Sequence, residues 1–444
     1  PRAGLSHAHY HRNGIGEMCS MSIRRMLIVI LFACALANAQ PAKSLRPEDG
    51  KKWFKGQTHS HTLWSDGDAA PELAVAWYKE HDYDFLSITD HNTMLRGEKL
   101  FLAGEKTRLT AERIAQLKEK FGNDWVEVSE AGGETVMRLK TYEELRKHFE
   151  VPGKFILIEG EEITSKAHVN GLNVRDKITA SKAETTEQVV RDHVHAVDEQ
   201  GKHYHVPMIA HVNHPNWGDF GVPPQDMIAV DTSRFFEIYN GHGGVKNWGD
   251  EKLRRVNTDR YWDIVLAVRL TKNPENILYG VGTDDTHDYF ERGPGGAIPG
   301  RGWCMVLSDK LEADAIMEAF KRGDFYASAG VLLDAIEWNE KEYRVSIQAE
   351  SGVTYKTIFY GTRKGADISS KPVEFEKGKE VPNAPYQYSD QLGIVLAETD
   401  ANPAVYTFKG DELYVRAKVV SSKLKPDPFK EGDVEMAWTQ PAVR

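Results

Sequence analysis

Two histidines separated by one residue, with an aspartate soon after, are the first side chains in the chain that could carry chemistry. His59, His61 and Asp66 lie in the stretch GQTHSHTLWSDG, directly after a short run over residues 53–58 that predicts a strand. Residues two apart on an extended chain point to the same side, so both imidazoles are expected to face one site. An H-x-H pair alone is a weak signal, because most strand histidines are ordinary core or surface residues.

Imidazole and carboxylate side chains recur at the ends of the other predicted strands. Asp90 and His91 follow the second strand, Glu159, Glu161 and Glu162 the third, His211 and His214 the fifth, and Asp285 and His287 the last, while His168 begins the fourth. In a parallel barrel the carboxyl ends of all strands share one face. His, Asp and Glu are the ligands of zinc, manganese and iron sites, and a carboxylate can bridge two ions. The pattern therefore predicts a polynuclear metal site.

The elements that must position these residues alternate between strand and helix, which is typical of a parallel sheet or barrel. Residues 70–81 predict a helix with Asp68 as its N-cap. Residues 95–150 are highly charged and predict an insertion of two helices and a hairpin around Gly132 and Gly133.

The pattern of apolar and polar residues changes at about residue 338. Tyr343, Val345 and Ile347 alternate with polar residues there, which predicts half-buried antiparallel strands. We therefore predict an α/β barrel domain over residues 40–337 and a small β-sandwich-like domain over residues 338–444. The second domain contains no histidine and is assigned no chemistry.

The start of the chain has the layout of a secretory signal peptide. Two arginines precede an apolar run that is short for a bilayer span and ends in Ala37-Asn38-Ala39, so cleavage is expected before Gln40. The histidines within residues 7–11 lie upstream of this peptide and are excluded from the site. We predict a periplasmic or secreted protein without a further membrane segment. Its only cysteine after the leader is Cys304, so an internal disulfide is excluded and the metal ligands must be His, Asp and Glu.

Composition limits the partners of the protein. The chain has 444 residues, 41% of them hydrophobic, and a formal net charge of −10, which suits a globular protein with a substantial core. The acidic balance argues against binding long nucleic acid through a broad basic face. A small-molecule ester is the expected partner, and the oligomeric state is left open.

The order of these motifs resembles that of the PHP family, named for polymerase and histidinol phosphatase. The resemblance covers about residues 53–335 and rests on THSHTLWSDG, SITDHN, EGEEIT followed by HVNGL, NHPNWG and GTDDTH. It implies a distorted (β/α)7 barrel that binds two or three divalent ions, zinc, manganese or iron, at the strand ends. The leader, GDFYASAG, the trailing β domain and the AWTQP ending are most similar to secreted, carbaryl-hydrolase-like members.

The resemblance also implies a ligand set. The metal ligands would be His59, His61, Asp66, His91, Glu162, His168, His214, Asp285 and His287. One ion would bind His59, His61, Glu162 and Asp285, a second would share Glu162 and bind His168 and His214, and a third would bind Asp66, His91 and His287. His211 stays an alternative to His214, and Asp284 to Asp285, although the His-Pro step and the D-x-H spacing favour the residues chosen. Glu161 is interpreted as a neighbour of the site.

Such a site predicts hydrolysis of a small phosphate mono- or diester by a metal-bridging hydroxide, since adjacent ions lower the pKa of a shared water and neutralise phosphoryl oxygens. Candidate substrate contacts in loops on the same face are Asn216, Tyr239, Asn240, His242 and Arg301, of which Asn216, His242 and Arg301 are preferred. The alternatives are a carboxylester or carbamate hydrolase on the same site and a binding protein that has lost turnover. The amidohydrolase class, which also opens with H-x-H, would not explain Asp66 together with Asp90 and His91.

Overall fold

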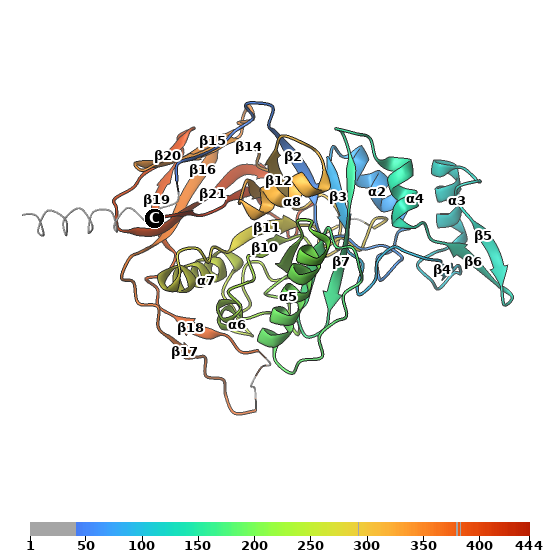
Figure 1. The fold of residues 1–444 in the computed structure, drawn as a ribbon, viewed down its shortest axis with the longest axis horizontal. Coiled ribbons are helices and arrows are strands. Elements are labelled where there is room, and N and C mark those ends of the chain that lie inside the picture. Colours follow the sequence, from blue (N-terminus) through green and yellow to red (C-terminus); the bar gives the residue numbers. More distant parts are fainter. Residues whose placement is uncertain (1–40, 292, 379–380, 382) are drawn as a thin grey trace, which may run out of the picture.

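The computed structural model of the protein describes residues 41–291, 293–378, 381 and 383–444 (Figure 1). The predicted signal peptide over residues 1–39 and its cleavage before Gln40 lie outside these ranges. Within them, no helix combines the length and the hydropathy that a lipid-spanning segment needs.

The strand ends singled out by the sequence belong to one long sheet. The first part of this sheet runs in the order β11-β10-β9-β8-β7-β3-β2. In chain order its strands are β2 (Lys52–Gln57), β3 (Phe85–Ile88), β7 (Ile156–Thr164), β8 (His168–Leu172), β9 (Ile209–Val212), β10 (Phe235–Asn240) and β11 (Tyr279–Thr283). Pairing is parallel from β2 through β3 to β7 and from β9 through β10 to β11, whereas β8 is antiparallel to both β7 and β9. The sheet is therefore mixed, whereas the sequence pattern indicates parallel strands throughout. The distorted (β/α)7 barrel stays a prediction.

The reversed direction of β8 follows from a short connection. Only residues 165–167 separate Thr164, the end of β7, from His168, the start of β8. A parallel neighbour needs a crossover of about a dozen or more residues, so a link this short turns the chain back on itself. Thr164 and His168 pair directly, and the start of β8 consequently lies at the rim where β7 ends.

The outer strands of this part of the sheet meet at the same rim. Ser60 beyond β2 and Thr286 beyond β11 form a parallel bridge. The His61 N–H donates to the Thr286 carbonyl at 2.9 Å, and the Asp285 N–H donates to the His59 carbonyl at 3.1 Å. These bonds place the H-x-H pair beside the D-x-H pair.

Helices connect and cover these strands. They are α2 (Pro71–Glu80), α5 (Thr186–Tyr204), α6 (Pro224–Ala229), α7 (Thr258–Lys272) and α8 (Ala313–Lys321). Side-chain caps set where two of them, α5 and α7, begin. Thr185 caps α5 by accepting the Gln188 N–H, which satisfies a donor that the first turn leaves open. The cap predicted for α2 is wrong: Ala70 occupies that position, and Asp68 instead accepts the Tyr289 N–H at 2.8 Å.

The charged insertion forms a small unit of its own at one end of the molecule (Figure 1). It contains α3 (Ala111–Phe121), α4 (Tyr142–Phe149) and a sheet in the order β4-β6-β5, with β4 (Leu100–Leu102), β5 (Val128–Ala131) and β6 (Glu134–Arg138). The predicted hairpin is confirmed, because Gly132 and Gly133 join β5 to β6 with φ values of 62° and 84°. Two consecutive positive φ angles suit a tight hairpin turn and favour glycine.

The long sheet continues from β2 into the C-terminal region. It runs on through β12 (Trp303–Ser308), β13 (Phe325–Ser328), β22 (Val434–Thr439), β21 (Glu412–Leu424), β16 (Tyr355–Arg363) and β19 (Ile394–Thr399), and β23 (Ala442–Val443) pairs with β21. A second sheet has the order β1-β14-β15-β20, with β1 (Lys43–Leu45), β14 (Leu333–Trp338), β15 (Glu342–Ile347) and β20 (Ala404–Thr407). A separate ribbon pairs β17 (Ser370–Pro372) with β18 (Tyr386–Tyr388).

Two sheets enclose the C-terminal core, as in a sandwich. Tyr343 and Val345 of β15 share one buried cluster with Val415 and Ala417 of β21. Along β15 these inward side chains alternate with half-buried ones, so the predicted alternation is confirmed. β1 and most of β14 precede residue 338 but belong to this layer, and the long sheet contains strands from both sides of that residue. The domain boundary proposed there therefore stays a prediction.

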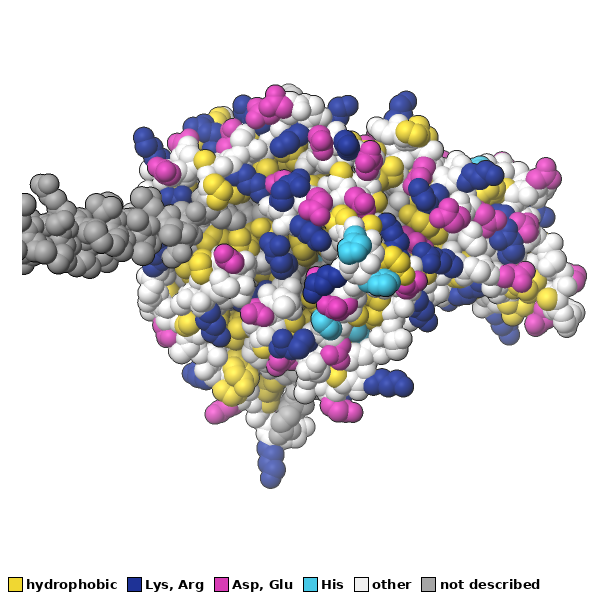
Figure 2. Space-filling model, viewed as in Figure 1, with side chains coloured by type: hydrophobic (Ala, Val, Ile, Leu, Met, Phe, Trp, Pro, Cys, Tyr) yellow, Lys and Arg dark blue, Asp and Glu magenta, His cyan; other side chains and the backbone are white. Residues whose placement is uncertain are grey.

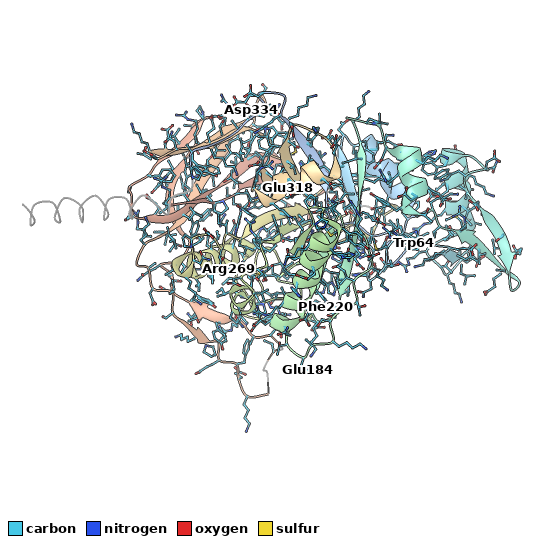
Figure 3. All side chains as sticks on the ribbon, viewed as in Figure 1. Trp64, Glu184, Phe220, Arg269, Glu318 and Asp334 are labelled. Atoms are coloured by element: carbon cyan, nitrogen blue, oxygen red, sulfur yellow. The ribbon has the colours of Figure 1, made fainter. Side chains whose placement is uncertain are left out.

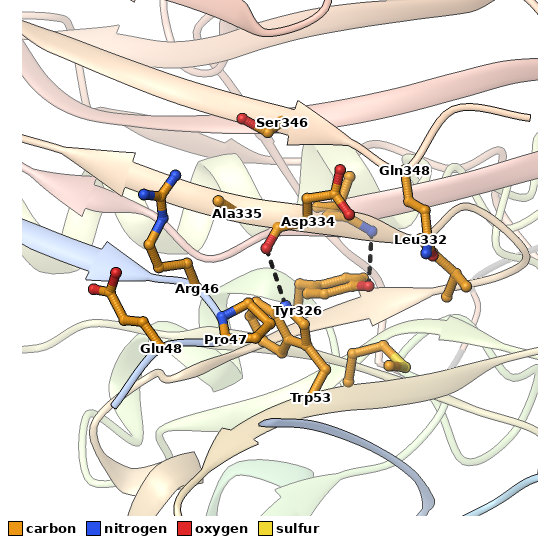
Figure 4. Close-up of a pocket in the computed structure, with 12 residues that line it drawn as sticks. Arg46, Pro47, Glu48, Trp53, Tyr326, Leu332, Asp334, Ala335, Ser346 and Gln348 are labelled. Carbon is orange, nitrogen blue, oxygen red and sulfur yellow. Dashed lines mark hydrogen bonds between the residues drawn. The ribbon is translucent and has the colours of Figure 1, made fainter. Parts of the chain in front are cut away.

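A groove of about 640 Å³ lies where the second sheet meets the long sheet (Figure 4). The Trp53 indole N–H donates to the Asp334 carbonyl at 3.3 Å, and the Leu333 N–H donates to the Tyr326 hydroxyl at 2.9 Å. The residues that line the groove include none of the predicted metal ligands.

The space-filling view shows acidic and basic side chains interspersed over the face drawn there (Figure 2).

Candidate metal centre

Glu162 lies at the middle of the site, fully buried in β7. Its Oε2 atom is 3.4 Å from His59 Nε2, 3.3 Å from His61 Nε2 and 2.9 Å from His91 Nδ1. In spite of these short distances, Oε2 has no hydrogen-bond partner with acceptable geometry. Three ring nitrogens thus surround one carboxylate oxygen without being bonded to it.

The second oxygen of Glu162 faces the reversed strand and the loop after β9. Oε1 lies 3.0 Å from His168 Nδ1 and 3.5 Å from His214 Nε2, and it accepts a hydrogen bond from Asn213 Nδ2 at 2.8 Å. His168 Nε2 and His214 Nδ1 are buried without partners. His168 reaches this position because β8 begins at the rim where β7 ends.

Asp285 brings a second carboxylate to the H-x-H pair. Its Oδ1 atom lies 3.1 Å from His59 Nε2 and 3.2 Å from His61 Nε2, and those two nitrogens are themselves 3.1 Å apart. Asp285 has a φ of 52° and His214 a φ of 26°, in the left-handed region that residues other than glycine seldom adopt. Strained backbone of this kind is typical of functional sites.

Asp66 forms the open side of the site. Its carboxylate oxygens lie 3.5 Å from His61 Nδ1, 3.4 Å from His91 Nε2 and 3.3 Å from His287 Nε2. The Asp66 side chain is 50% exposed, whereas Glu162 and His61 are fully buried. Solvent therefore reaches the site from the side of Asp66.

Three groups of side chains place their ligand atoms close enough to hold a metal ion. They are His61 with Asp66, His91 and His287; His59 with His61 and Asp285; and His91 with Glu162 and His168. Eight of the nine predicted ligands belong to these groups, and His214 lies beside Glu162 at the distance given above. The donor set of imidazoles and carboxylates fits zinc, manganese or iron, and a cation would satisfy the unbonded atoms. The assignment of each ligand to a particular ion stays a prediction.

The alternatives left open by the sequence occupy different positions. His211 Nε2 lies 3.4 Å from the Thr58 carbonyl, on the main chain that precedes the H-x-H pair. Glu161 points to the opposite face of β7, as strand alternation requires, and accepts the Ile178 N–H at 2.5 Å. Asp284 accepts hydrogen bonds from the N–H groups of residues 300–302 and from the Tyr78 hydroxyl, so it ties loops together.

Glu237 of β10 is part of the site although the sequence reasoning missed it. It lies 2.7 Å from His59 Nδ1 and accepts hydrogen bonds from the Thr283 hydroxyl, the Asn240 amide and the His214 N–H. The one available signal was a single charged residue within the apolar run RFFEIYN. Because a carboxylate bonded to Nδ1 holds the proton there, His59 presents the lone pair of Nε2 to the site.

The predicted substrate contacts divide into two kinds. Asn216 donates to the Lys246 and Val256 carbonyls, and every N–H group of the Arg301 guanidinium donates to a main-chain carbonyl, so both side chains hold loops in place. His242 is different, because its ring packs 5.2 Å from that of His287, centroid to centroid. Substrate contact by any of the three stays a prediction.

The other two loop candidates are also tied to neighbouring residues. Asn240 donates to Glu237 at 2.8 Å and to Asp285 at 3.0 Å, and thus links two carboxylates of the site. The Tyr239 hydroxyl accepts a hydrogen bond from Lys425 Nζ at 2.7 Å and is buried. Asn240 therefore positions two carboxylates of the site, and Tyr239 belongs to the packing between β10 and the C-terminal strands.

Burial and neighbouring charges shift the pKa values of the site in opposite directions. Burial alone would raise the pKa of Glu162, but the imidazoles of His91, His59 and His168 hold it well below its usual value. Burial opposes charge on His91 as well, yet Glu162 and Asp66 raise its pKa to about 11. The carboxylates are thus ionised at neutral pH and demand nearby positive charge, which protons on histidine or bound cations supply.

Comparison with known proteins adds one distant similarity. No model of a known protein family matches the chain, and no curated protein matches it. A solved two-domain protein from Bacteroides vulgatus, described as containing a predicted PHP-like metal-dependent phosphoesterase, is 14% identical, with 91% of this chain and 98% of that chain aligned and a TM-score of 0.38. A TM-score this low supports no inference about the function of the chain. The narrower resemblance to carbaryl-hydrolase-like proteins finds no support in these comparisons.

Proposed function

We propose that this protein is a metal-dependent hydrolase that acts on a small phosphate mono- or diester and binds two or three divalent ions around Glu162. The observation that carries this proposal is the Oε2 atom of Glu162, which is buried and unbonded within 3.4 Å of nitrogens from His59, His61 and His91. A buried carboxylate oxygen without a partner is costly in free energy. His59, His61 and His91 would hold a cation there, and a bound cation would remove this cost for the oxygen.

The residues of the chain support hydrolysis in distinct ways. When bound, divalent ions would lower the pKa of a coordinated water and neutralise the oxygens of an ester. Glu237 holds the proton on His59 Nδ1, and Asn240 keeps Asp285 turned toward the site. Asp66 is half exposed, so the ester would approach the site from its side.

His242 is the side chain of this chain that we expect to orient the substrate. Its Nδ1 atom accepts the Gly244 N–H at 2.9 Å, so the ring proton resides on Nε2. The Asn240 side chain accepts the His242 N–H at 2.8 Å and fixes the residue beside the ligands. Nε2–H is thus available as a hydrogen-bond donor to an oxygen of the substrate, with no proton transfer required.

A substrate panel tests the proposal. Chelator-treated protein is reloaded with Mn²⁺ or Zn²⁺ and assayed on p-nitrophenyl phosphate, its bis ester, a nucleoside 3′,5′-bisphosphate and a carbamate ester. Metal-dependent release of phosphate or of a phosphate monoester, abolished by Glu162→Gln, is the expected result. Turnover of the carbamate alone would replace phosphoester chemistry with carboxylester or carbamate hydrolysis. Bound metal without turnover of any ester would favour a binding protein.

Location is a separate part of the proposal. The leader-like sequence ending at Ala39 supports export to the periplasm or the medium. Fractionation of cells that produce the full chain tests this, together with N-terminal sequencing of the mature protein. A mature protein that begins at Gln40 is expected, and an uncleaved cytoplasmic protein would contradict export.

A further inference from the structure

Three basic residues of the insertion hold the loop that carries Asp66. Arg108 donates from Nη2 to the Ser65 carbonyl at 3.1 Å and from Nη1 to the Gly67 carbonyl at 3.0 Å. Lys99 donates to the Trp64 carbonyl, and Arg113 donates to the Asp68 carbonyl at 3.1 Å. The main-chain carbonyls on both sides of Asp66 are therefore bound by the insertion.

Aromatic packing strengthens the same contact. The Trp64 indole N–H donates to the Lys140 carbonyl at 3.0 Å, and Trp64 is buried at the junction between the insertion and the rest of the molecule (Figure 3). The Lys99 ammonium lies 5.4 Å from the centre of the Trp64 ring. The loop that carries Asp66 and the insertion thus belong to one apolar core, in addition to the hydrogen bonds between them.

Asp66 needs such support more than the other predicted ligands do. Its side chain is 50% exposed and follows β2 by several residues, so no strand hydrogen bonds fix it. Metal–oxygen bonds are only about 2.0–2.2 Å long, and a loop that moves by an ångström no longer supplies the ligand. Arg108 donates hydrogen bonds to the carbonyls of the two residues that flank Asp66, and the Asp66 carboxylate points toward His91 and His287.

We propose that the insertion over residues 95–150 is a positioning element of the metal centre, and that Arg108 is the residue through which it fixes Asp66. This inference rests on the proposed metal-dependent function. The insertion completes the most open ion position, which Asp66, His91 and His287 form. Arg108 acts through the main chain of the loop and is a positioning residue, not a ligand.

The experiment is a Mn²⁺ titration of the chelator-treated full chain, with bound ions counted by mass spectrometry. Arg108→Ala should weaken the most weakly bound ion by about 10- to 100-fold, the range seen when groups that orient metal ligands are lost. Arg108→Lys keeps the charge but offers a single nitrogen, so an intermediate effect is expected. Because this variant perturbs folding least, it keeps the test valid if Arg108→Ala unfolds.

Two comparisons separate positioning from general stabilisation. Arg138→Ala is the matched control, since Arg138 pairs with Glu127 and Glu144 inside the insertion and should leave Mn²⁺ binding unchanged. Asp66→Ala should abolish the weakest ion site, and adding Arg108→Ala to it should cause no further loss, as expected for two residues that act on one site.

Three outcomes would overturn the inference. Unchanged Mn²⁺ binding by Arg108→Ala, with wild-type protein still binding metal, would remove the role of the insertion and leave the proposed function intact. Independent, additive losses of Mn²⁺ affinity in the double variant would also remove the role of the insertion and leave the proposed function intact. A wild-type protein that binds no Mn²⁺ at all would overturn the proposed function together with this inference.

Discussion

Glu237 shows how a carboxylate behind a histidine can set the orientation and the proton position of that histidine. Its carboxylate holds the proton of His59 Nδ1 and also accepts hydrogen bonds from Thr283, Asn240 and the main chain of His214. The same carboxylate therefore sets the orientation of a predicted ligand that follows β2 and of one from the loop after β9.

Replacing this carboxylate by its amide tests that role. Glu237→Gln keeps the size of the side chain but removes the charge that holds the His59 proton, so metal affinity should fall by about 10- to 100-fold. Isothermal titration with Zn²⁺ or Mn²⁺ measures the change. Glu161→Gln is the matched control, because Glu161 is also buried beside the site yet accepts the Ile178 N–H on the other face of β7. Equal affinities of wild type and Glu237→Gln would contradict the role.

For single residues the sequence is informative wherever a side chain type is rare and recurs at the ends of successive strands. His59, His61, Glu162 and Asp285 come together as the motif order predicts, and their binding of metal stays a prediction. Glu237 was missed because one glutamate in an apolar strand fits an exposed edge position as well as a buried one. Its importance depends on partners from three other segments, which a linear pattern does not reveal.

The loop between β2 and α2 presents Asp66 through a tight turn. Gly67 donates its N–H to the Thr62 carbonyl at 3.0 Å and closes the turn that presents Asp66. A Cβ atom at Gly67 would lie 2.6 Å from the main chain of His61 and Thr62. Backbone atoms cannot yield as a flexible side chain does, so only glycine fits this turn without a shift.

Gly67→Ala should accordingly move the loop and weaken the open ion position. We expect a loss of about 1–3 kcal/mol in the free energy of unfolding, the usual cost of forcing an extra methyl group into a packed site. Weaker binding of one Mn²⁺ equivalent should accompany it. Denaturant unfolding and the Mn²⁺ titration measure both effects. Gly218→Ala serves as control, because a Cβ atom there meets nothing within 4 Å. Wild-type behaviour of Gly67→Ala would show that the loop tolerates displacement.

Element type is predictable from the sequence, but strand direction is not. The run HVNGLNV has the same apolar pattern in either direction, so the pattern indicates one more parallel strand where the structure has an antiparallel one. The short connection over residues 165–167 carries the missing information, because it excludes a crossover. The cap of α2 was missed for a similar reason: Asp68 has a tertiary partner in the Tyr289 N–H.

Across the whole molecule, polar side chains join the C-terminal strands to the helices that cover the first part of the long sheet. Arg416 of β21 donates to Asp263 of α7 at 2.7 Å and to Asp259 at 3.1 Å, and its guanidinium lies 4.7 Å from the centres of the Trp262 and Tyr360 rings. Breaking such a buried pair costs about 3–5 kcal/mol. The sequence indicates a separate β domain after residue 338, whereas the long sheet and these bonds link both parts of the molecule. This link could not be predicted, because pairing between strands that are distant in the chain leaves no local signal in the sequence.

Lys425 lies at the same junction and should make stability depend on pH. Burial is the main cause that lowers the pKa of its amine to about 7, against 10.5 when exposed. Between pH 7 and 10.5 the unfolded chain therefore binds more protons at this residue than the folded chain. The contribution of Lys425 to the free energy of unfolding rises with pH in that window, by up to about 1.4 kcal/mol per unit.

Lys425→Met removes this contribution. Its unfolding free energy, measured in denaturant at about pH 7, 8 and 9, should rise less steeply with pH than that of wild type. Lys364→Met, at an exposed position, controls for the loss of one positive charge. Parallel curves for wild type and Lys425→Met would show that the amine is not titrated by folding.

The most direct test of the metal centre is anomalous diffraction from crystals of the protein grown with Mn²⁺. The proposed function predicts two or three anomalous peaks beside the Glu162 carboxylate, each within about 2.0–2.3 Å of nitrogen or oxygen atoms of the nine predicted ligands. No peak at Glu162 at saturating Mn²⁺, or peaks bound only elsewhere on the molecule, would contradict it.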